Sequence, residues 1–427
     1  MNIAQAVEAI RQGAFDETLK KLYPRYDSDP EKYRNRIEAL MKAYTEHFPE
    51  PEDIHLFSAP GRIEVGGNHT DHQHGNVLAA AIDRDMIAAA GLNGTEKIRV
   101  FSIGFGGLEI ELNDLDPHDD EKETTASLVR GVTAEIKKAG FPVKGFDVCI
   151  ASDVPGGSGI SSSAAFEVLY GEVLNGLFCG NQHSPVTLAK IGQYAEQHYF
   201  GKPSGLMDQT ASAVGGFVAI DFKDTASPVI RPISTAELSK DYVIYVIDTG
   251  SAHADLSNVY AGIPIEMRRV AAFFGKEVLR EVDENDFWNA IGKVRKETGD
   301  RAVLRAIHFF EENRRAIDEA AALEQGNIGE FLRITKESGF SSFIHLQNVI
   351  ISGQTEHQDV AFALACAEHA LNGKGAFRVH GGGFAGTILA IVPTEDQDRF
   401  KQEVEAQLFP GACTLMSIRP IGCAQVL

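Results

Sequence analysis

The sequence predicts an α+β protein, and three observations lead to that class. Apolar residues alternate or run together over residues 77–92 and 242–247, as they do in strands. They recur at helical spacing over residues 164–177, and the segment from 273 to about 340 is charged, amphipathic and helical in pattern. Residues 146–165 give a strand, a glycine-rich loop and a helix in direct succession. We therefore expect strands and helices throughout the body of the protein.

The composition narrows the possible partners. The chain has 427 residues, enough for two or three domains with buried cores. Its hydrophobic content of 44% and charged content of 23% are typical of a soluble globular protein. A formal net charge of −20 argues against nucleic acid or an anionic membrane as a partner, because both favour a basic surface. We expect small-molecule ligands and a monomer or small homo-oligomer.

Cysteine usage and the apolar runs predict a cytoplasmic protein. The five cysteines are scattered and form no C-x-x-C pair: Cys149, Cys179, Cys366, Cys413 and Cys423. We expect small buried hydrophobic residues rather than a disulfide framework or a zinc site. No apolar signal-peptide core follows Met1, and runs such as residues 385–392 are too short to span a bilayer.

Several elements follow in chain order. Residues 1–50 alternate apolar and charged positions at helical spacing, with breaks at Pro24 and Pro30. They predict two or three surface helices without catalytic residues. Residues 97–112 are strand-like, and residues 128–139 predict a helix.

The glycine-rich loop is the centre of the predicted site. The strand before it alternates at Phe146, Val148 and Ile150, which predicts a half-buried strand. Glycines let the backbone approach a ligand closely, and the helix start that follows directs N–H groups and a positive dipole end at one point. This arrangement suits a phosphate. An ordinary glycine turn with a serine N-cap is the plain alternative, and no Gly-Lys-Ser/Thr of a Walker loop is present.

The string of residues in this loop favours the phosphate interpretation, because it resembles the nucleotide-phosphate loop of the GHMP small-molecule kinases. Ile160 stands where that family usually has Leu. The resemblance implies that ATP is bound by Pro155, Gly156, Gly157, Ser158, Gly159, Ile160, Ser161, Ser162, Ser163 and Ala164.

Residues 58–75 hold a second glycine-rich stretch, with three histidines but no cysteine, so zinc is disfavoured. The stretch resembles the galactokinase signature, Gly-Arg-Val-Asn-Leu-Ile-Gly-Glu-His-Thr-Asp-Tyr-x-x-Gly. The resemblance implies that Arg62 lies near the reacting hydroxyl and that Asn68, His69 and Asp71 take sugar-binding places.

Four positions of this stretch depart from the family signature. Glu64, Gly66, Asn68 and His72 stand where the family has Asn, Ile, Glu and Tyr. The departure at Asn68 matters most, because the family's glutamate there accepts hydrogen bonds from the sugar, and an amide offers donors as well as an acceptor. The identity of the sugar therefore stays open at this point.

Residues 195–209 resemble a third stretch of the family, Glu-His-x-Phe-x-Gly-x-Pro-Cys-Gly-Ile-Met-Asp-Gln. Alone, Glu196 would be a solvated helix residue and Asp208 a helix cap. In register with the family, Glu196 takes the role of a magnesium ligand together with Ser163, and Asp208 that of the catalytic base. Gly205 keeps the family's glycine at a substrate-binding place.

Two further stretches carry the resemblance. In residues 248–260 the spacing of His253 and Tyr260 is that of the family, whose tyrosine faces the sugar. Residues 378–387 resemble the third GHMP motif, a glycine turn that packs close to the phosphate loop. The only tryptophan, Trp288, is far from the place where galactokinases stack the adenine, so the choice between ATP and another nucleotide stays open.

The resemblance covers roughly residues 51–427 and implies two α+β lobes with the active site in the cleft between them. We divide the chain into an N-terminal helical extension (1–50), an N-terminal lobe (51–225) and a C-terminal lobe (226–427), with the boundary placed by proline and polar residues in 221–232.

The implied activity is transfer of phosphate from ATP to the anomeric hydroxyl of galactose, with Mg²⁺. Two alternatives remain. One is a kinase for another sugar, such as a uronic acid or a modified hexose. The other is a galactose- and ATP-binding regulator without catalysis.

Overall fold

The computed structural model describes residues 1–154, 159–202, 204–233, 237–251 and 256–427. Among these residues, no helix combines the length and the apolar character that a membrane crossing requires.

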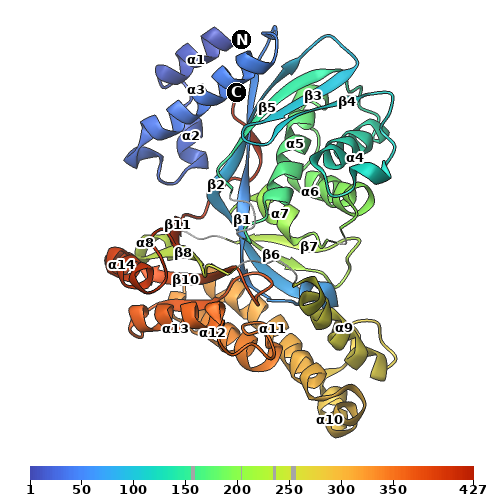
Figure 1. The fold of residues 1–427 in the computed structure, drawn as a ribbon, viewed down its shortest axis with the longest axis vertical. Helices are drawn as coiled ribbons and strands as arrows, with labels where there is room; N and C mark the ends of the chain where they lie inside the picture. Colours follow the sequence, from blue (N-terminus) through green and yellow to red (C-terminus); the bar gives the residue numbers. More distant parts are fainter. Residues whose placement is uncertain (155–158, 203, 234–236, 252–255) are drawn as a thin grey trace.

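An extended sheet forms the upper half of the molecule in Figure 1. Its central path runs β12-β1-β2-β5-β3-β4, and β6 and β7 branch from β2. The strands are β1 (His55–Gly66), β2 (Asn76–Leu92), β3 (Lys97–Ser102), β4 (Gly106–Glu111), β5 (Phe146–Ser152), β6 (Phe217–Asp221), β7 (Val229–Ile233) and β12 (Ala424–Gln425). The predicted strand 97–112 is a hairpin of two strands, because glycines turn the chain between β3 and β4.

Helices cover both faces of this sheet (Figure 1). One face carries α4 (Thr125–Lys138), α5 (Ser162–Phe178), α6 (Pro185–Ala195) and α7 (Met207–Val214), and the other carries α1 (Ile3–Arg11), α2 (Asp16–Leu22) and α3 (Pro30–His47). The half-buried strand predicted at 146–150 is therefore wrong. In β5, Phe146, Val148 and Ile150 enter the main core, while Cys149 between them is buried against the N-terminal helices.

The N-terminal helices have a core of their own and reach the edge of the phosphate loop. Arg36 of α3 pairs with Asp85 of β2 and with Asp153, whose Oδ2 lies 3.2 Å from the Arg36 Nε atom. The two chain ends lie on this side of the sheet, where the carbonyl of Leu427 accepts a hydrogen bond from the Leu56 amide.

The lower half of the molecule contains a four-stranded sheet in the order β11-β8-β10-β9. Its strands are β8 (Tyr242–Asp248), β9 (Ala376–Val379), β10 (Thr387–Pro393) and β11 (Cys413–Met416). The helices of this half are α8 (Leu238–Asp241), α9 (Ser257–Phe273), α10 (Glu284–Thr298), α11 (Asp300–Glu324), α12 (Ile328–Ser341), α13 (Asp359–Leu371) and α14 (Gln397–Gln407). Apolar residues of α13 and α14 pack on one face of this sheet.

Short helical turns join these elements: η1 (Tyr26–Ser28), η2 (Asp71–Gln73), η3 (Asp119–Glu121), η4 (Glu196–Phe200), η5 (Leu279–Glu281), η6 (Ser342–Leu346) and η7 (Thr394–Asp396). The boundary segment proposed at 221–232 covers the end of β6, a turn and most of β7, two strands that pair with each other. The division into 51–225 and 226–427 stays a proposal.

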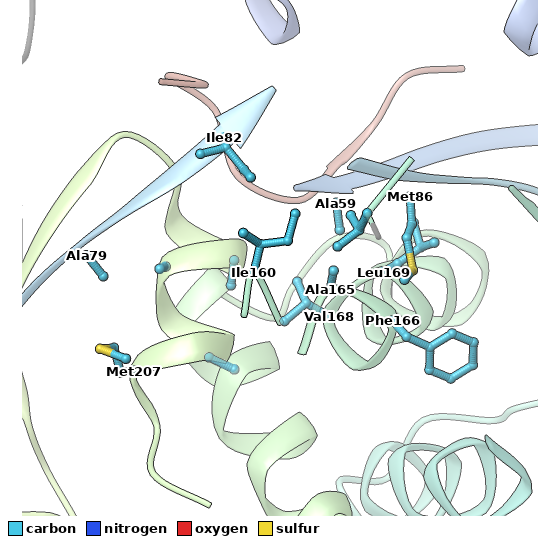
Figure 2. Close-up of a cluster of buried hydrophobic side chains, with 14 of the residues drawn as sticks. Ala59, Ala79, Ile82, Met86, Ile160, Ala165, Phe166, Val168, Leu169 and Met207 are labelled. Carbon is cyan, nitrogen blue, oxygen red and sulfur yellow. The ribbon is translucent and has the colours of Figure 1, made fainter. Parts of the chain in front are cut away.

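A cluster of apolar side chains packs against the start of α5. Figure 2 shows Ile160 among side chains from both central strands and from α5 and α7. Ala59 belongs to β1 and Ile82 to β2, while Val168 lies on α5. Because Ile160 is buried in this cluster, the last part of the glycine-rich loop has a fixed position against the sheet.

Candidate active site

An arginine and an aspartate form a close ion pair where β1 approaches α7. Arg62 follows a register irregularity in β1, which turns its side chain away from the regular alternation. Its Nε atom donates to Asp208 Oδ1 at 2.7 Å and its Nη2 atom to Asp208 Oδ2 at 2.9 Å. The remaining nitrogen donates to the carbonyl of Gly159. The predicted catalytic pair therefore meets directly beside the phosphate loop.

The Asp208 carboxylate is held in its ionised form. Burial opposes ionisation, but the charge and hydrogen bonds of Arg62 and a hydrogen bond from the Ser161 hydroxyl outweigh it and lower the pKa of Asp208 below its ordinary 3.8. Ser161 is the residue before α5, with a left-handed backbone (φ 54°), and its side chain makes no helix cap. The serine N-cap weighed from the sequence is thus not formed by Ser161, because its hydroxyl is directed to Asp208 instead.

A second carboxylate, Glu196, lies near the start of α5. It is 2% exposed, and its Oε1 atom accepts hydrogen bonds from the Ser163 hydroxyl (3.3 Å) and from Lys202 Nζ (2.8 Å). Its Oε2 atom accepts from Gln209 Nε2 at 2.9 Å. The solvated helix position that Glu196 would occupy on its own is not observed, because the turn η4 directs it into the protein.

Ser163 and Glu196 form a donor set that fits magnesium. Both offer oxygen atoms, the ligands that this hard cation prefers, and they lie within hydrogen-bonding distance of each other. Mg²⁺ in phosphate-binding sites usually has only one or two protein ligands, the rest being water and phosphate oxygens. No group of three or more His, Cys, Asp or Glu that could hold a metal occurs among the described residues.

The stretch after β1 contains Asn68, one of the residues predicted to bind the sugar. Its side chain is fully buried and uses every hydrogen-bonding position. The Asn68 Nδ2 atom donates to Glu64 Oε1 (2.8 Å) and to the Gly381 carbonyl (2.7 Å), and Oδ1 accepts from Asn348 (2.9 Å) and Ser342 (3.3 Å). This geometry does not favour the contact between Asn68 and the sugar, which stays a prediction.

Helix α11 anchors the same stretch with buried charges. Glu312 accepts hydrogen bonds from the backbone amides of Gly67 (3.1 Å) and Asn68 (3.2 Å), and Arg315 pairs with it at 2.7 Å. Burial alone would raise the pKa of Glu312, yet Arg315 and its other neighbours lower it to about 2. His308 Nε2 lies 2.9 Å from the Asn68 carbonyl. These anchors lie more than 230 residues away along the chain, and no local sequence signal points to them.

Gly66 replaces the family's isoleucine for a spatial reason. A Cβ atom on Gly66 would lie 1.7 Å from Glu319 Oε2, so the Glu319 carboxyl occupies the place of a side chain there. Burial raises the pKa of Glu319 to about 8, which favours its neutral form.

The histidines form a neutral chain rather than a metal site. Gln73 donates to His72 Nδ1 at 3.2 Å, His72 Nε2 lies 3.3 Å from His69 Nδ1, and His69 Nε2 lies 3.0 Å from the Gly382 carbonyl. A carbonyl only accepts, so His69 carries its proton on Nε2 and accepts from His72. Burial lowers the pKa of His69 to about 4 and that of His72 well below its usual value.

The third glycine motif joins the phosphate loop to β1. The Glu64 amide donates to His380 Nε2 at 3.2 Å, so the His380 proton is on Nδ1 and bonds Thr387 Oγ1 at 2.9 Å. Burial lowers the pKa of His380 to about 3. A Cβ atom on Gly159 would lie 3.5 Å from His380 Nδ1, which places this motif beside the loop. Sequence reasoning assigned His380 no role, although it lies within the motif.

A cavity of ≈ 1250 Å³ unites these groups. Its lining includes both members of the ion pair and four of the five predicted substrate residues, namely Arg62, His69, Asp71, Gly205, Asp208 and Tyr260. Glu64, His72 and Arg268 also line it, whereas Asn68 does not. Burial raises the pKa of Asp71, and the Tyr260 hydroxyl donates to the Gly383 carbonyl at 2.8 Å.

Some predicted residues lie outside the described part of the chain: Pro155, Gly156, Gly157, Ser158 and His253. Of the predicted nucleotide residues, those described lie at the end of the loop and the start of α5: Gly159, Ile160, Ser161, Ser162, Ser163 and Ala164. Lys202, which pairs with Glu196, was not predicted, although it lies within the stretch 195–209 that carried the resemblance.

The regions that form this site are similar in sequence to known proteins. Residues 127–216 match the family described as GHMP kinases N terminal domain, and residues 42–92 match the galactokinase galactose-binding signature. A galactokinase of Glaesserella parasuis serovar 5 (strain SH0165) is 29% identical over 377 residues, covering 86% of this chain and 92% of that relative. A galactokinase of Streptococcus suis (strain 05ZYH33) is 29% identical over 378 residues, with the same coverage of both chains.

Solved structures show the same fold. Lactococcus lactis galactokinase complexed with galactose is 26% identical with a TM-score of 0.77, covering 91% of this chain and 99% of that chain. Methanococcus jannaschii mevalonate kinase is 14% identical with a TM-score of 0.60, covering 86% of this chain and 99% of that chain, a likeness of fold alone.

The chain is similar to the GHMP kinases, and the predicted α+β fold of that family is confirmed. Within the family, its similarity is to the galactokinases, as the sequence motifs indicated. Kinases of this family use ATP as co-substrate.

Proposed function

We propose that this protein is a galactokinase that transfers the terminal phosphoryl group of ATP to the anomeric hydroxyl of galactose. The observation that carries the proposal is the Arg62–Asp208 pair at the wall of a cavity that the galactose-binding signature also lines. The galactokinases that resemble the chain over most of its length support the choice of sugar.

In this proposal Asp208 is the general base. Its lowered pKa keeps it ionised at neutral pH, ready to accept the hydroxyl proton, a role worth about 10²–10⁴-fold in rate. Arg62 orients the carboxylate through two parallel hydrogen bonds and stabilises negative charge on the attacking oxygen. Phosphoryl transfer depends mainly on such positioning and charge stabilisation.

The phosphate loop and α5 would bind the nucleotide. Free amides at the start of a helix and the closely approaching glycine backbone suit its phosphates. Ser163 and Glu196 would hold Mg²⁺, whose charge neutralises the phosphate oxygens when it is bound. Lys202, now paired with Glu196, adds positive charge at the same place.

The sugar would lie against the part of the cavity that the stretch after β1 lines. His69, Asp71, Gly205 and Tyr260 are the proposed contacts, and the lobes 51–225 and 226–427 both contribute lining residues. A kinase for a modified hexose or a uronic acid is the second candidate, favoured by the departures at Glu64, Gly66 and Asn68.

A kinase assay tests the proposal. The purified protein is assayed with galactose, galactosamine, galacturonate and glucose, each with ATP and with GTP, and Mg²⁺ is omitted in a parallel series. We expect galactose and ATP to give the highest kcat/KM, and no turnover without the metal. Activity confined to another sugar would replace galactose in the proposal, and binding of galactose and ATP without turnover would indicate the non-catalytic regulator.

A further inference from the structure

Two positions of the sugar signature have exchanged their chemistry. The family signature has an amide four residues before its carboxylate, whereas this chain has the carboxylate first, at Glu64, and the amide second, at Asn68. A single loss of the family's glutamate would have removed a carboxyl group from this region. The exchange retains one carboxyl and one amide.

The structure shows that the two exchanged side chains contact each other. Asn68 Nδ2 donates to Glu64 Oε1 at 2.8 Å, and its other hydrogen goes to the Gly381 carbonyl. The Asn68 oxygen is taken by Asn348 and Ser342. Asn68 therefore has no hydrogen-bonding position left for a ligand, and it is fully buried.

Glu64 differs from Asn68 in one respect that matters for binding. Its Oε1 atom accepts from Asn68 and from Arg378 Nη2 (2.9 Å). Its Oε2 atom accepts no hydrogen bond from any residue that the structure describes. Since Oε2 is not one of the buried polar atoms that lack a partner, it is accessible from outside the protein interior. Glu64 lines the cavity that also holds Asp208 and His69. One carboxyl oxygen is thus held inside the protein, and the other is available to the cavity.

The position of this oxygen is fixed from several sides. Arg378 is fully buried and also donates to the Val65 carbonyl, so it cannot turn away from Glu64 easily. The Glu64 amide is bound to His380, and the register of β1 is irregular just after Glu64. Binding groups that are fixed before the ligand arrives lose little entropy when it binds.

We propose that Glu64 Oε2 binds a hydroxyl group of the sugar, and that Glu64 replaces in this chain the glutamate that the family has at position 68. The inference rests on the proposed sugar kinase function and names the residue that recognises one hydroxyl of the sugar. The oxygen accepts a hydrogen bond from that hydroxyl when Glu64 is ionised. Burial raises the pKa of Glu64, and in the protonated form the same atom donates to the hydroxyl oxygen.

A purely structural role for Glu64 makes a different prediction. If the carboxyl served only as the partner of Arg378, its replacement would affect every sugar alike. If the Glu64 carboxyl binds one hydroxyl, its replacement should lower kcat/KM for sugars that carry that hydroxyl. It should leave kcat/KM for the sugar that lacks the hydroxyl nearly unchanged.

The test combines Glu64→Gln with the set of monodeoxygalactoses that keep the anomeric hydroxyl. In the unaltered protein we expect one of these sugars to lose roughly tenfold or more in kcat/KM relative to galactose. In Glu64→Gln, kcat/KM for galactose should fall roughly tenfold, mainly because KM rises. The sugar that lacks the one recognised hydroxyl should then have a kcat/KM only slightly lower than that of galactose. The KM for ATP should stay within about twofold, because Glu64 lies on the sugar side. Equal losses on all sugars, or an unchanged KM for galactose, would overturn the inference.

A matched control is Glu319→Gln, which alters a buried carboxyl of the same region that does not line the cavity. It should leave the pattern across the deoxy sugars unchanged. If galactose is not phosphorylated but another sugar is, the proposed function fails, and the same cycle is run with the deoxy forms of that sugar.

The exchange itself supplies a second variant in case Glu64→Gln does not fold. Glu64→Asn combined with Asn68→Glu restores the family arrangement and keeps one carboxyl and one amide beside Arg378. Because position 68 is buried and does not line the cavity, a carboxyl there does not reach the sugar, and we expect the KM for galactose to rise roughly tenfold. A folded, ATP-binding exchange variant whose KM for galactose is unchanged would also overturn the inference.

Discussion

The two sides of the cavity are built differently. On the phosphate side, Glu196 and Asp208 contact residues that are near in the fold and belong to the N-terminal half of the chain, such as Arg62 and Ser161. On the sugar side, the stretch after β1 is held by groups that come from much later in the chain: His308, Glu312, Glu319, Asn348 and Arg378.

The two sides also differ in how closely they follow the family pattern. The phosphate side keeps the family's Glu196 and Asp208 and has one mild change, Ile160 in place of Leu. Besides His72, the sugar side departs at Glu64, Gly66 and Asn68. Each of these three residues touches a distant buried group, so the departures form one connected arrangement rather than separate losses. The difference teaches that the changed positions of the motif are fixed by residues distant in the sequence, whereas the phosphate side is held within its own half of the chain.

The largest expected effect is on the phosphate side. Asp208→Asn should lower kcat by at least ~100-fold, because an amide cannot accept the hydroxyl proton, while ATP binding stays nearly intact. Single-turnover kinetics and an ATP-induced shift in Tm measure the two quantities. Asp221→Asn is the control, since it alters another carboxylate paired with an arginine, Arg280, that does not line the cavity. A loss of only a few-fold in Asp208→Asn would remove Asp208 from the role of base.

On the sugar side, Gly66→Ala should destabilise the fold by about 1–3 kcal/mol, because the new methyl group would meet Glu319 Oε2. Urea unfolding gives the free energy of unfolding. Gly171→Ala in α5 is the control, because a Cβ atom there would have its nearest contact at 3.5 Å. The double variant Gly66→Ala with Glu319→Ala should recover part of the loss. A Gly66→Ala protein as stable as the unaltered one would show that this contact is easily relieved.

The pH dependence of stability sharpens the comparison through Glu319. Burial raises the pKa of Glu319 to about 8 from an ordinary 4.5, so the folded protein binds this proton more tightly than the unfolded chain does. Binding of this proton therefore adds to the free energy of unfolding. The contribution is fully present below pH 4.5 and is lost as pH rises toward 8.

Glu319→Gln removes this proton equilibrium. The free energy of unfolding of the variant, relative to the unaltered protein, should therefore rise by about 3 kcal/mol between pH 5 and pH 8. Urea unfolding at several pH values measures the difference. A difference that does not change with pH would mean that Glu319 is ionised in the folded protein.

The smallest expected effect returns to the phosphate side. Glu196→Gln should weaken the Mg²⁺ dependence of ATP binding by roughly five- to tenfold, since a charged oxygen ligand is lost. Glu167→Gln is the matched control, because burial raises the pKa of this neighbouring carboxyl well above its usual value, and a neutral carboxyl is a poor ligand. Titration of ATP binding with Mg²⁺ measures both. Identical curves for Glu196→Gln and the unaltered protein would exclude Glu196 as a ligand.

The sequence by itself determined the fold class, the family resemblance and the elements that carry the phosphate side. The strand, loop and helix at 146–178 depend on local periodicity and on glycine, which act over a few residues. The Asp208 and Glu196 positions followed from motifs that keep their order and spacing. The pairing of Arg62 with Asp208, 146 residues apart, could be expected only through the family resemblance.

Only the tertiary structure decided the environment of the sugar stretch. The sequence pattern gave Asn68 a contact with the sugar, whereas the fold surrounds it with Glu64, Asn348 and Ser342. It likewise left Gly66 unexplained until α11 placed Glu319 in the space of its side chain. The burial of β5 on both faces depended on helices that pack from the N-terminal extension. The physical reason is the same in each case. Periodicity and spacing describe what a segment does along the chain, while burial and hydrogen-bond pairing depend on which distant residues pack against it.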